Sequence, residues 1–387
     1  MLFSHGLGGS RNAYSHICGS LASHGIVVVA PDHRDGSAPI SFIHGSSSAK
    51  PIKSVDYKRI DHKPSSDVYA ARDEQLRVRL SEVGLIHSAL LKIDTRQRLT
   101  NVAGDARTSA GKDMLTMFAH LLAVHEPGSI SFAGHSFGAA TTLQLVKSVF
   151  HNNTSSAPAS YKPLFTTRPD SALRAQITPT SPVVLLDLWT LPIQSPATAW
   201  LRSQPMPSYT SSNGGGGSNI LSILSEGFFK WSTNMNETVR LLAPPKQTGQ
   251  QQRQQGAHIF YPIHSAHLSQ SDFGILFPWA TMKFFGVKEP ERVLKLNTRA
   301  ALQVLRNSGV EVANTSVADL ELGEGKEGVV NDNAILSTQT GSVRGWICVK
   351  ADAAAVGEAK EGETKVGTGP GDAVMQGEAF GQGVGGQ

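Results

Sequence analysis

The chain has 387 residues, of which 40% are hydrophobic and 17% charged, and its formal net charge is +4. This composition is typical of a globular protein with a sizeable core. The small positive excess is scattered along the chain, which argues against nucleic-acid binding. Only Cys18 and Cys348 are cysteines, so a disulfide framework is excluded, and no Cys/His spacing resembles that of a zinc site. No apolar run approaches the roughly 18 residues that a membrane-spanning helix needs.

The chain opens on a short apolar run, Met1 to Phe3, directly before a glycine-rich turn at residues 5–9. Natural sheets seldom start so abruptly, so we expect one or more further strands to precede this one in the complete fold. No basic and then apolar leader is present, and this favours a cytoplasmic protein.

Short β-like runs then alternate with helical stretches, the pattern of a parallel sheet covered by helices. Strands are predicted over residues 25–30, 129–133, 182–186, 219–225 and 257–261. Gly134 is expected to interrupt the second of them. Helices are predicted to begin at Arg72 and to cover residues 137–149 and about 290–307. The first carries Leu76, Leu80 and Val83 on one face, which we expect to be buried.

Several segments fall outside this alternation. Residues 151–180 and 241–256 are predicted to be surface insertions, and the glycine run at 213–218 a flexible connector. We therefore expect one α/β catalytic domain over residues 1–315. Residues 316–387 are predicted to form a largely disordered, low-complexity tail, because the final part has almost no large apolar side chains to bury.

The strongest local motif is Gly134-His135-Ser136-Phe137-Gly138, a G-x-S-x-G sequence between a predicted strand and a predicted helix. In an α/β-hydrolase this sequence forms a tight turn that lifts the serine hydroxyl above the sheet. The glycines are needed because a Cβ at either position would collide with the turn or the adjoining strand. Ser136 is therefore predicted to be a nucleophile. Neighbouring side chains of such a turn point in different directions, so a packing role is expected for His135.

A serine hydroxyl is a weak nucleophile at neutral pH and needs a histidine base that is oriented by a carboxylate. In this fold the acid follows the serine in the chain and the histidine follows the acid. Asp187 comes directly after the strand at 182–186, which places its carboxylate at the edge of the sheet where active-site loops gather. Asp170, in a polar segment, and Asp272, beyond the candidate histidines, are weaker candidates.

The candidate base is His267, which lies just past the predicted strand at 257–261. His264 and His258 lie close to it in the sequence. Position alone favours His267 but leaves the other two histidines open as alternatives.

Ester hydrolysis passes through a tetrahedral intermediate whose negative oxygen needs backbone N–H donors. One donor is normally the residue after the nucleophile, here Phe137, and the other comes from a glycine-rich turn after an earlier strand. The turn His5-Gly6-Leu7-Gly8-Gly9 has this character. It lacks the third glycine of a dinucleotide-binding loop, which argues against a nucleotide site.

Taken together, these motifs resemble the platelet-activating-factor acetylhydrolase family, the calcium-independent phospholipase A2 branch of the α/β-hydrolases. The similar stretches are FSHGLGGSR from Phe3, LASHGIVVVAPDHRDGSA from Leu21, RDEQLRVR from Arg72, GHSFGAAT from Gly134, LLDLWTLP from Leu185, LSEGF from Leu224 and SAHLSQSDF from Ser265. The resemblance extends from Met1 to roughly residue 310. The insertions and the tail fall outside it and are similar to additions in fungal-type members.

The resemblance implies Ser136 as nucleophile, Asp187 as acid and His267 as base, with the N–H groups of Leu7 and Phe137 as oxyanion donors. It implies hydrolysis of the sn-2 ester of phospholipids with short or oxidised acyl chains, through an acyl-enzyme and without a metal or other cofactor. The substrate would be met at a membrane or lipid-particle surface. A general lipase or cutinase-like carboxylesterase and an inactive hydrolase-fold binding protein are the alternatives.

Overall fold

The computed structural model describes residues 1–45, 52–97, 99, 114–152, 156–211, 215–245, 256–316, 332–339 and 341–349. Its strands are β1 (Leu2–Ser4), β2 (Ile40–Ile43), β3 (Lys53–Asp56), β4 (Phe132–His135), β5 (Val183–Leu186), β6 (Ile220–Ile223), β7 (His258–Pro262) and β8 (Trp346–Cys348). Its helices are α1 (Ser15–Ser23), α2 (Ser66–Asp94), α4 (Phe137–Phe150), α5 (Ala172–Gln176), α6 (Ala199–Ser203), α7 (Glu226–Lys230), α8 (Ser232–Leu242), α9 (Phe273–Leu276), α10 (Pro278–Phe285) and α11 (Pro290–Asn307). None of the helices formed by these residues has the length and hydropathy of a membrane span.

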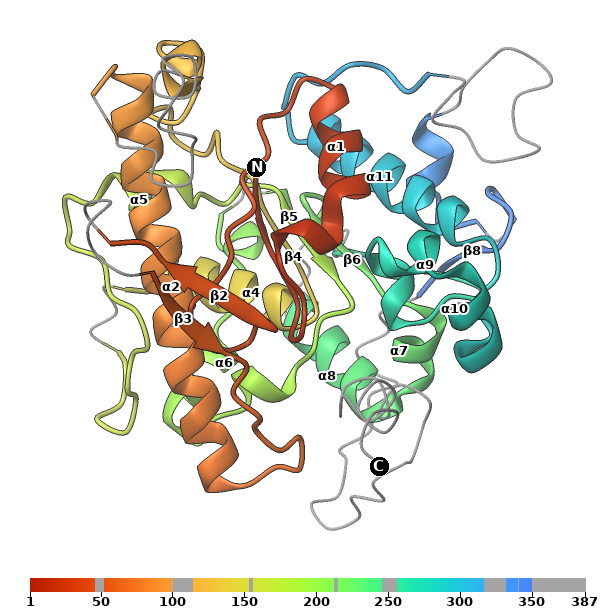
Figure 1. Ribbon diagram of the computed structural model, residues 1–387, viewed down its shortest axis with the longest axis horizontal. Coiled ribbons are helices and arrows are strands. Elements are labelled where there is room, and N and C mark those ends of the chain that lie inside the picture. Colours follow the sequence, from red (N-terminus) through yellow and green to blue (C-terminus); the bar gives the residue numbers. More distant parts are fainter. Residues whose placement is uncertain are drawn as a thin grey trace, which may run out of the picture.

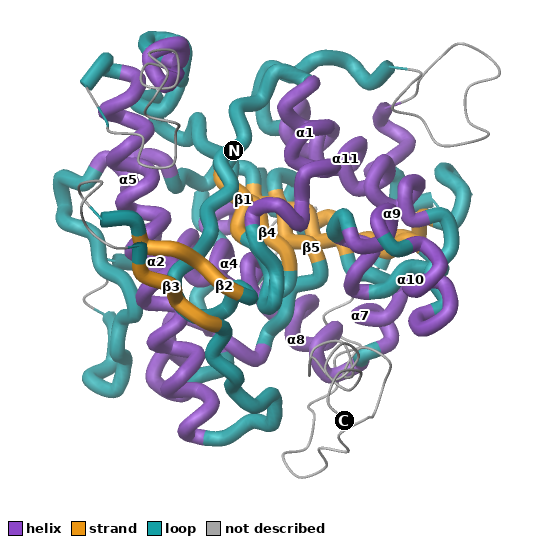
Figure 2. The backbone as a smooth tube through the Cα atoms, viewed as in Figure 1, coloured by secondary structure: helices purple, strands orange, loops and turns teal. Residues whose placement is uncertain are grey.

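The centre of the molecule is a six-stranded sheet in the order β1-β4-β5-β6-β7-β8. Strands β1, β4, β5, β6 and β7 are parallel, and β8 runs antiparallel to β7. β2 and β3 pair with each other in a separate antiparallel ribbon, which Figure 2 shows apart from the central strands. The predicted architecture, a mostly parallel sheet flanked by helices, is confirmed.

Helices cover both faces of this sheet, and successive strand residues alternate between the two faces. In β5, Val183 and Leu185 belong to one hydrophobic cluster, whereas Val184 and Leu186 belong to another. The first cluster includes side chains of α2, α4 and α8, and the second includes those of α1 and α11, which pack together (Figure 1). A strand buried on both faces has no polar face, which explains the continuous apolar run that predicted it.

Two of the predicted strands differ in the structure. The run at 25–30 is not a strand: it makes one bridge, between Val29 and Leu2, because β1 offers only three residues for pairing. β4 is shifted toward the serine and contains Gly134, which pairs with Ser4 on one side and Leu185 on the other. Pairing with both neighbours carries the strand through a glycine that local propensity disfavours.

The helices predicted at 137–149 and 290–307 are confirmed as α4 and α11. α2 begins at Ser66, ahead of the predicted start at Arg72. The reason is a helix cap, since the Ser65 side chain accepts a hydrogen bond of 3.3 Å from the N–H of Val68.

Part of the predicted tail belongs to the folded domain. Trp346 of β8 stacks on Phe260 of β7 with ring centroids 5.2 Å apart, and its Nε1–H donates to the carbonyl of Ile335 at 2.8 Å. Ile335 is itself completely buried. The boundary expected at residue 315 is therefore wrong for residues 332–339 and 341–349, whose apolar runs are short and separated by polar residues and glycine.

The expected insertions also have packed parts. Leu173 and Ile177 join the hydrophobic cluster under α4, so residues 151–180 are not wholly a surface feature. In the connector, a Cβ on Gly217 would overlap the backbone of Gly256, so this part of it is packed against a neighbouring segment. The rest of the connector (213–214) lies outside the described residues, as do residues 153–155 and 246–255 of the insertions and residues 317–331, 340 and 350–387 of the tail.

Candidate active site

Ser136 occupies the sharp turn between β4 and α4. Its backbone angles are φ 56° and ψ −116°, a strained combination for a residue with a side chain. The turn requires glycine on both sides: a Cβ on Gly134 would overlap the carbonyl group of Gly138, and a Cβ on Gly138 would overlap the carbonyl group of Ser4. The backbone therefore has the strand-to-helix geometry expected from the motif.

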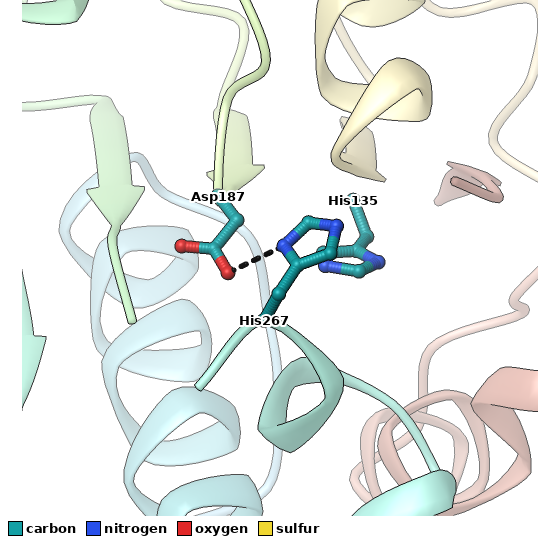
Figure 3. Close-up of side chains that lie close together, drawn as sticks. All are labelled: His135, Asp187 and His267. Carbon is teal, nitrogen blue, oxygen red and sulfur yellow. Dashed lines mark hydrogen bonds and ion pairs between the residues drawn. The ribbon is translucent and has the colours of Figure 1, made fainter. Parts of the chain in front are cut away.

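Asp187 and His267 lie together at the carboxyl ends of β5 and β7. His267 Nδ1 is 2.9 Å from Asp187 Oδ2 (Figure 3), and Asp187 Oδ1 accepts a hydrogen bond from the N–H of Ser225. The His267 ring stacks on Phe228, with ring centroids 4.5 Å apart and planes 10° from parallel. A neutral His267 that donates from Nδ1 to the carboxylate has Nε2 left to accept a proton.

The elbow is joined to the strand end that carries the acid. The N–H of Ser136 donates to the carbonyl of Leu186 at 2.8 Å, and the carbonyl of Ser136 accepts a hydrogen bond from Trp189 at 3.4 Å. Ser136 Oγ is buried and has no hydrogen-bond partner among the described residues. The structure thus brings Ser136, Asp187 and His267 to one edge of the sheet.

The competing acids have other tasks. Asp272 accepts hydrogen bonds from the backbone N–H groups of Ser15 and His16, at 2.7 and 3.0 Å, and thereby caps the first turn of α1. Asp170 forms an exposed ion pair with Arg168, with 3.8 Å between the charged atoms. The geometry favours Asp187 as the acid.

The competing histidines also have other surroundings. His264 is exposed in a turn with φ 57°, and its backbone N–H donates to the carboxylate of Glu226. His258 begins β7, and its ring stacks on Phe260 with centroids 6.4 Å apart. The contact with Asp187 therefore favours His267 over the other two histidines as the candidate base.

The glycine-rich turn at residues 5–9 lies directly against the nucleophile. A Cβ built on Gly6 would be 3.1 Å from Ser136 Cβ, a tighter approach than ordinary van der Waals contact. Glycine at this position lets the backbone that carries Leu7 come close to the serine.

The direction of the Leu7 N–H is fixed by the neighbouring carbonyl. His33 donates its backbone N–H to His5 Nε2 at 3.1 Å, so a neutral His5 carries its proton on Nδ1. Burial lowers the pKa of His5 to about 3, which keeps the ring neutral. His5 Nδ1–H donates to the Gly6 carbonyl at 2.8 Å, which also accepts the N–H of Gly9 at 3.1 Å. Because the peptide is planar and trans, the Leu7 N–H points the opposite way from this carbonyl.

Phe137, the other predicted oxyanion donor, is the first residue of α4. The N–H groups in the first turn of a helix have no acceptor within the helix. The N–H of Phe137 is therefore available beside Ser136, as the sequence predicts for an oxyanion donor.

His135 takes part in a chain of hydrogen bonds that begins in the turn. The Gly6 N–H donates to the Tyr14 hydroxyl at 2.9 Å, and this hydroxyl donates its own proton to His135 Nδ1 at 2.8 Å. Burial and the neighbouring His267 lower the pKa of His135 well below its ordinary value. The ring centroids of His135 and His267 are 4.4 Å apart, and a neutral His135 does not repel the positive charge that His267 gains in proton transfer.

Two histidines and one aspartate in the site are residue types that also bind metal ions. His135, Asp187 and His267 offer ligand atoms that lie within 4.8 Å of one another (Figure 3). Both oxygens of Asp187 already accept hydrogen bonds, and His135 Nδ1 accepts one from Tyr14. These bonds suit proton transfer better than metal ligation.

The sequence predictions did not include Arg79, which is buried beneath the turn at 5–9. A signal was present in α2, where Arg72, Arg79 and Glu82 recur at helical spacing among the apolar residues Leu76 and Leu80. Polar residues interspersed along a helix face that must be buried indicate a polar network in the core, since charged groups are rarely buried without partners.

An elbow serine after a parallel strand, with an acid and a histidine after later strands of the same sheet, defines an α/β-hydrolase. The chain belongs to the family of platelet-activating factor acetylhydrolase, isoform II, whose model matches residues 1–326. The resemblance noted in the sequence is thereby confirmed.

Individual relatives agree with this assignment. A putative phospholipase A2 of Schizosaccharomyces pombe is 26% identical over an alignment of 365 residues, which covers 89% of this chain and 72% of that protein. The platelet-activating factor acetylhydrolases of Bos taurus and Canis lupus familiaris are 38% and 34% identical over 146 and 145 residues. These two matches cover 37% of this chain and 31% of each relative.

Proposed function

We propose that Ser136, Asp187 and His267 act as a catalytic triad that hydrolyses the sn-2 ester of phospholipids with short or oxidised acyl chains. The family makes this chain an ester hydrolase, and the names of its relatives support a phospholipid substrate. The observation that carries the proposal is the Asp187–His267 hydrogen bond at the edge of the sheet where the elbow presents Ser136.

The geometry suits a two-step reaction. His267 Nε2 removes the hydroxyl proton of Ser136 as Oγ attacks the ester carbonyl carbon, and the resulting oxyanion is held by the N–H groups of Leu7 and Phe137. The imidazolium, stabilised by Asp187, then protonates the glycerol oxygen as its bond to the acyl carbon breaks, which leaves an acyl-enzyme and a lysophospholipid. Water, deprotonated by His267, attacks the acyl carbon, and Ser136 regains its proton as the carboxylic acid leaves.

A serine-directed fluorophosphonate tests the nucleophile. We expect the wild-type chain to be labelled and Ser136→Ala to be unlabelled. Ser148→Ala is the matched control, because Ser148 is a buried serine in the same helix α4, and this variant should be labelled like the wild type. Folded wild-type protein that is not labelled would favour the inactive binding protein.

A comparison of substrates tests the acyl-chain preference. We expect 1-alkyl-2-acetyl phosphatidylcholine to be hydrolysed with a higher kcat/KM than phosphatidylcholine with two long acyl chains. A preference for long-chain triglycerides would instead favour the general lipase.

We also propose that α9 and α10 meet the phospholipid surface. Five large apolar side chains on this segment are more than half exposed, namely Leu276 (63%), Phe277 (54%), Trp279 (63%), Met282 (55%) and Phe284 (64%). Exposed apolar side chains gathered on one short segment are typical of an interaction site. Lys283 Nζ lies 4.7 Å from the centre of the Trp279 ring, and aromatic and lysine side chains together suit the boundary between acyl chains and headgroups. α9 packs against the turn that begins with His267, which links the patch to the site.

Vesicle binding tests this surface. We expect the double variant Trp279→Ser with Phe284→Ser to sediment less with phosphatidylcholine vesicles while hydrolysing a water-soluble ester at the wild-type rate. The control is Leu85→Ser with Leu121→Ser, because these leucines are 65% and 74% exposed on other parts of the molecule. Equal loss of vesicle binding in both double variants would contradict the proposal.

A further inference from the structure

Arg79 of α2 reaches both segments that carry the oxyanion donors. Its Nη1 donates to the carbonyl of His5 at 2.9 Å, at the start of the turn that contains Leu7. Its guanidinium carbon lies 4.2 Å from the centre of the Phe137 ring. One fully buried side chain therefore contacts both halves of the predicted oxyanion hole.

A second link joins Arg79 to the backbone of Phe137. Nη1 also donates to Thr141 Oγ1 at 3.3 Å, and the Thr141 hydroxyl donates to the Phe137 carbonyl at 2.8 Å. The guanidinium thus fixes this residue through its ring and, by way of one hydroxyl, through its carbonyl.

Arg79 also supports the far end of the turn. Its Nη2 donates to Ser37 Oγ, and the backbone carbonyl of Ser37 accepts the N–H of Gly8 at 2.8 Å. Its Nε donates to Asp35 Oδ2 at 2.7 Å, and Asp35 in turn accepts the Ser37 hydroxyl. The chain is held both before and after Leu7 by groups that one guanidinium connects.

The chemistry of the pair favours a geometric role. The side chains of Arg79 and Asp35 are both completely buried, and the attraction between buried charges offsets the loss of hydration only in part. Catalysis, by contrast, gains most from donors that are already in place when charge develops on the substrate. The planar fork of arginine can hold several acceptors at fixed angles, which a lysine cannot do.

We propose that Arg79 is a positioning residue of the oxyanion hole, which sets the turn at residues 5–9 and Phe137 at a fixed separation. Their N–H groups are thereby preorganised for the tetrahedral intermediate. The inference rests on the proposed function, because it concerns the hole that serves Ser136.

Arg72 provides the matched control. It is also buried and lies on α2, and its guanidinium carbon is 5.7 Å from the Phe137 ring and 5.0 Å from the Trp189 ring. Its hydrogen bonds go to Gln75 and to the carbonyl of Ile60, away from the turn at 5–9. Arg72 is linked to the network of Arg79 only indirectly, through the Gln75 amide, which donates to the Asp35 carbonyl at 3.2 Å. Arg72→Lys therefore reports the cost of changing a buried arginine beside Phe137 that makes no hydrogen bond of its own to the described residues of the turn.

The test compares Arg79→Lys with Arg72→Lys on a water-soluble ester. We expect Arg79→Lys to lower kcat by about 100-fold or more, as loss of an oxyanion donor does, while KM changes by less than about threefold because ground-state binding is retained. The pH midpoint of kcat/KM should stay at the wild-type value, since Asp187 and His267 are untouched. Affinity for a trifluoromethyl ketone analogue, which forms a tetrahedral adduct with Ser136, should fall in parallel with kcat/KM. We expect Arg72→Lys to keep kcat within about threefold of wild type.

Wild-type kcat in folded Arg79→Lys, or an equal loss in both lysine variants, would overturn the proposal. If Arg79→Lys does not fold, as judged by circular dichroism, Ser37→Ala decides, because it removes one Arg79 contact with a small change. A several-fold lower kcat at an unchanged Tm supports the proposal, and an unchanged kcat refutes it. A wild-type chain that neither hydrolyses esters nor reacts with a fluorophosphonate contradicts the proposed function itself, so the two failures are distinguishable.

Discussion

The two sides of Ser136 are held by different kinds of contact. On the acid–base side, the His267 ring is hydrogen-bonded to Asp187 and lies between the rings of Phe228 and His135, whose centroids are 4.5 and 4.4 Å away. On the oxyanion side, the turn at residues 5–9 is fixed by a buried network in which Arg79 is central.

The difference follows from what each side has to do. In the proposed mechanism the His267 imidazole gains and loses a proton within each catalytic cycle, so its Nε2 has to be left without a competing partner. The oxyanion donors keep the same charge and position throughout the proposed reaction. Donors that had to move into place as the transition state forms would lower the rate.

Asp187→Asn breaks the acid–base side. An asparagine amide can donate to His267 Nδ1 and thus stabilise the wrong tautomer of the base, so kcat should fall by about 10⁴-fold. Steady-state kinetics on a short-chain ester measure this loss, and circular dichroism checks that the fold is kept. A kcat within tenfold of wild type would show that Asp187 is not the acid.

Gly138→Ala breaks the oxyanion side by sterics. The new Cβ would overlap the carbonyl group of Ser4 in β1, and neither backbone can move without disrupting the sheet, so the free energy of unfolding should fall by more than about 3 kcal/mol. Urea denaturation measures this change. Gly19→Ala is the control: a Cβ there meets nothing within 4 Å in the middle of α1, and the higher helix propensity of alanine should stabilise the chain by up to about 1 kcal/mol. A wild-type unfolding midpoint for Gly138→Ala would contradict the packing of the elbow.

The pH dependence of stability sharpens the comparison further. Burial lowers the pKa of His5 to about 3 in the folded chain, from the ordinary histidine value of 6.5. As the pH falls, His5 is protonated at a higher pH in the unfolded chain than in the folded chain. Its contribution to the free energy of unfolding is therefore present above about pH 6.5 and is lost as the pH falls toward 3. His33 and His135 are shifted in the same direction by burial.

Urea midpoints at pH 7.5 and pH 4.5 test this expectation. The loss of stability between the two should be smaller in His5→Asn, whose amide can still donate to the Gly6 carbonyl but does not titrate. The control is His264→Asn, since His264 is an exposed histidine outside the glycine-rich turn at residues 5–9. An equal loss of stability in His5→Asn and the wild type would show that His5 does not resist protonation.

Much of the site could be predicted because it depends on local chemistry. The G-x-S-x-G motif dictates its own turn, since only glycine fits at positions 134 and 138. Asp187 follows a run of apolar residues that is recognisable as a buried strand. The choice among His258, His264 and His267 was not settled by position. The resemblance favoured His267, and only the structure brings it within hydrogen-bond distance of Asp187.

The sequence by itself determined the order of the chemical groups along the chain and the parallel sheet that carries them. Only the tertiary structure decided what holds the oxyanion turn, how far β4 extends and that β8 pairs with β7 in the sheet. The physical reason is the same in each case. These features depend on contacts between residues far apart in the chain, such as Arg79 with His5 or Trp346 with Phe260. Such contacts cannot be predicted from the periodicity or the secondary-structure propensity of a single segment.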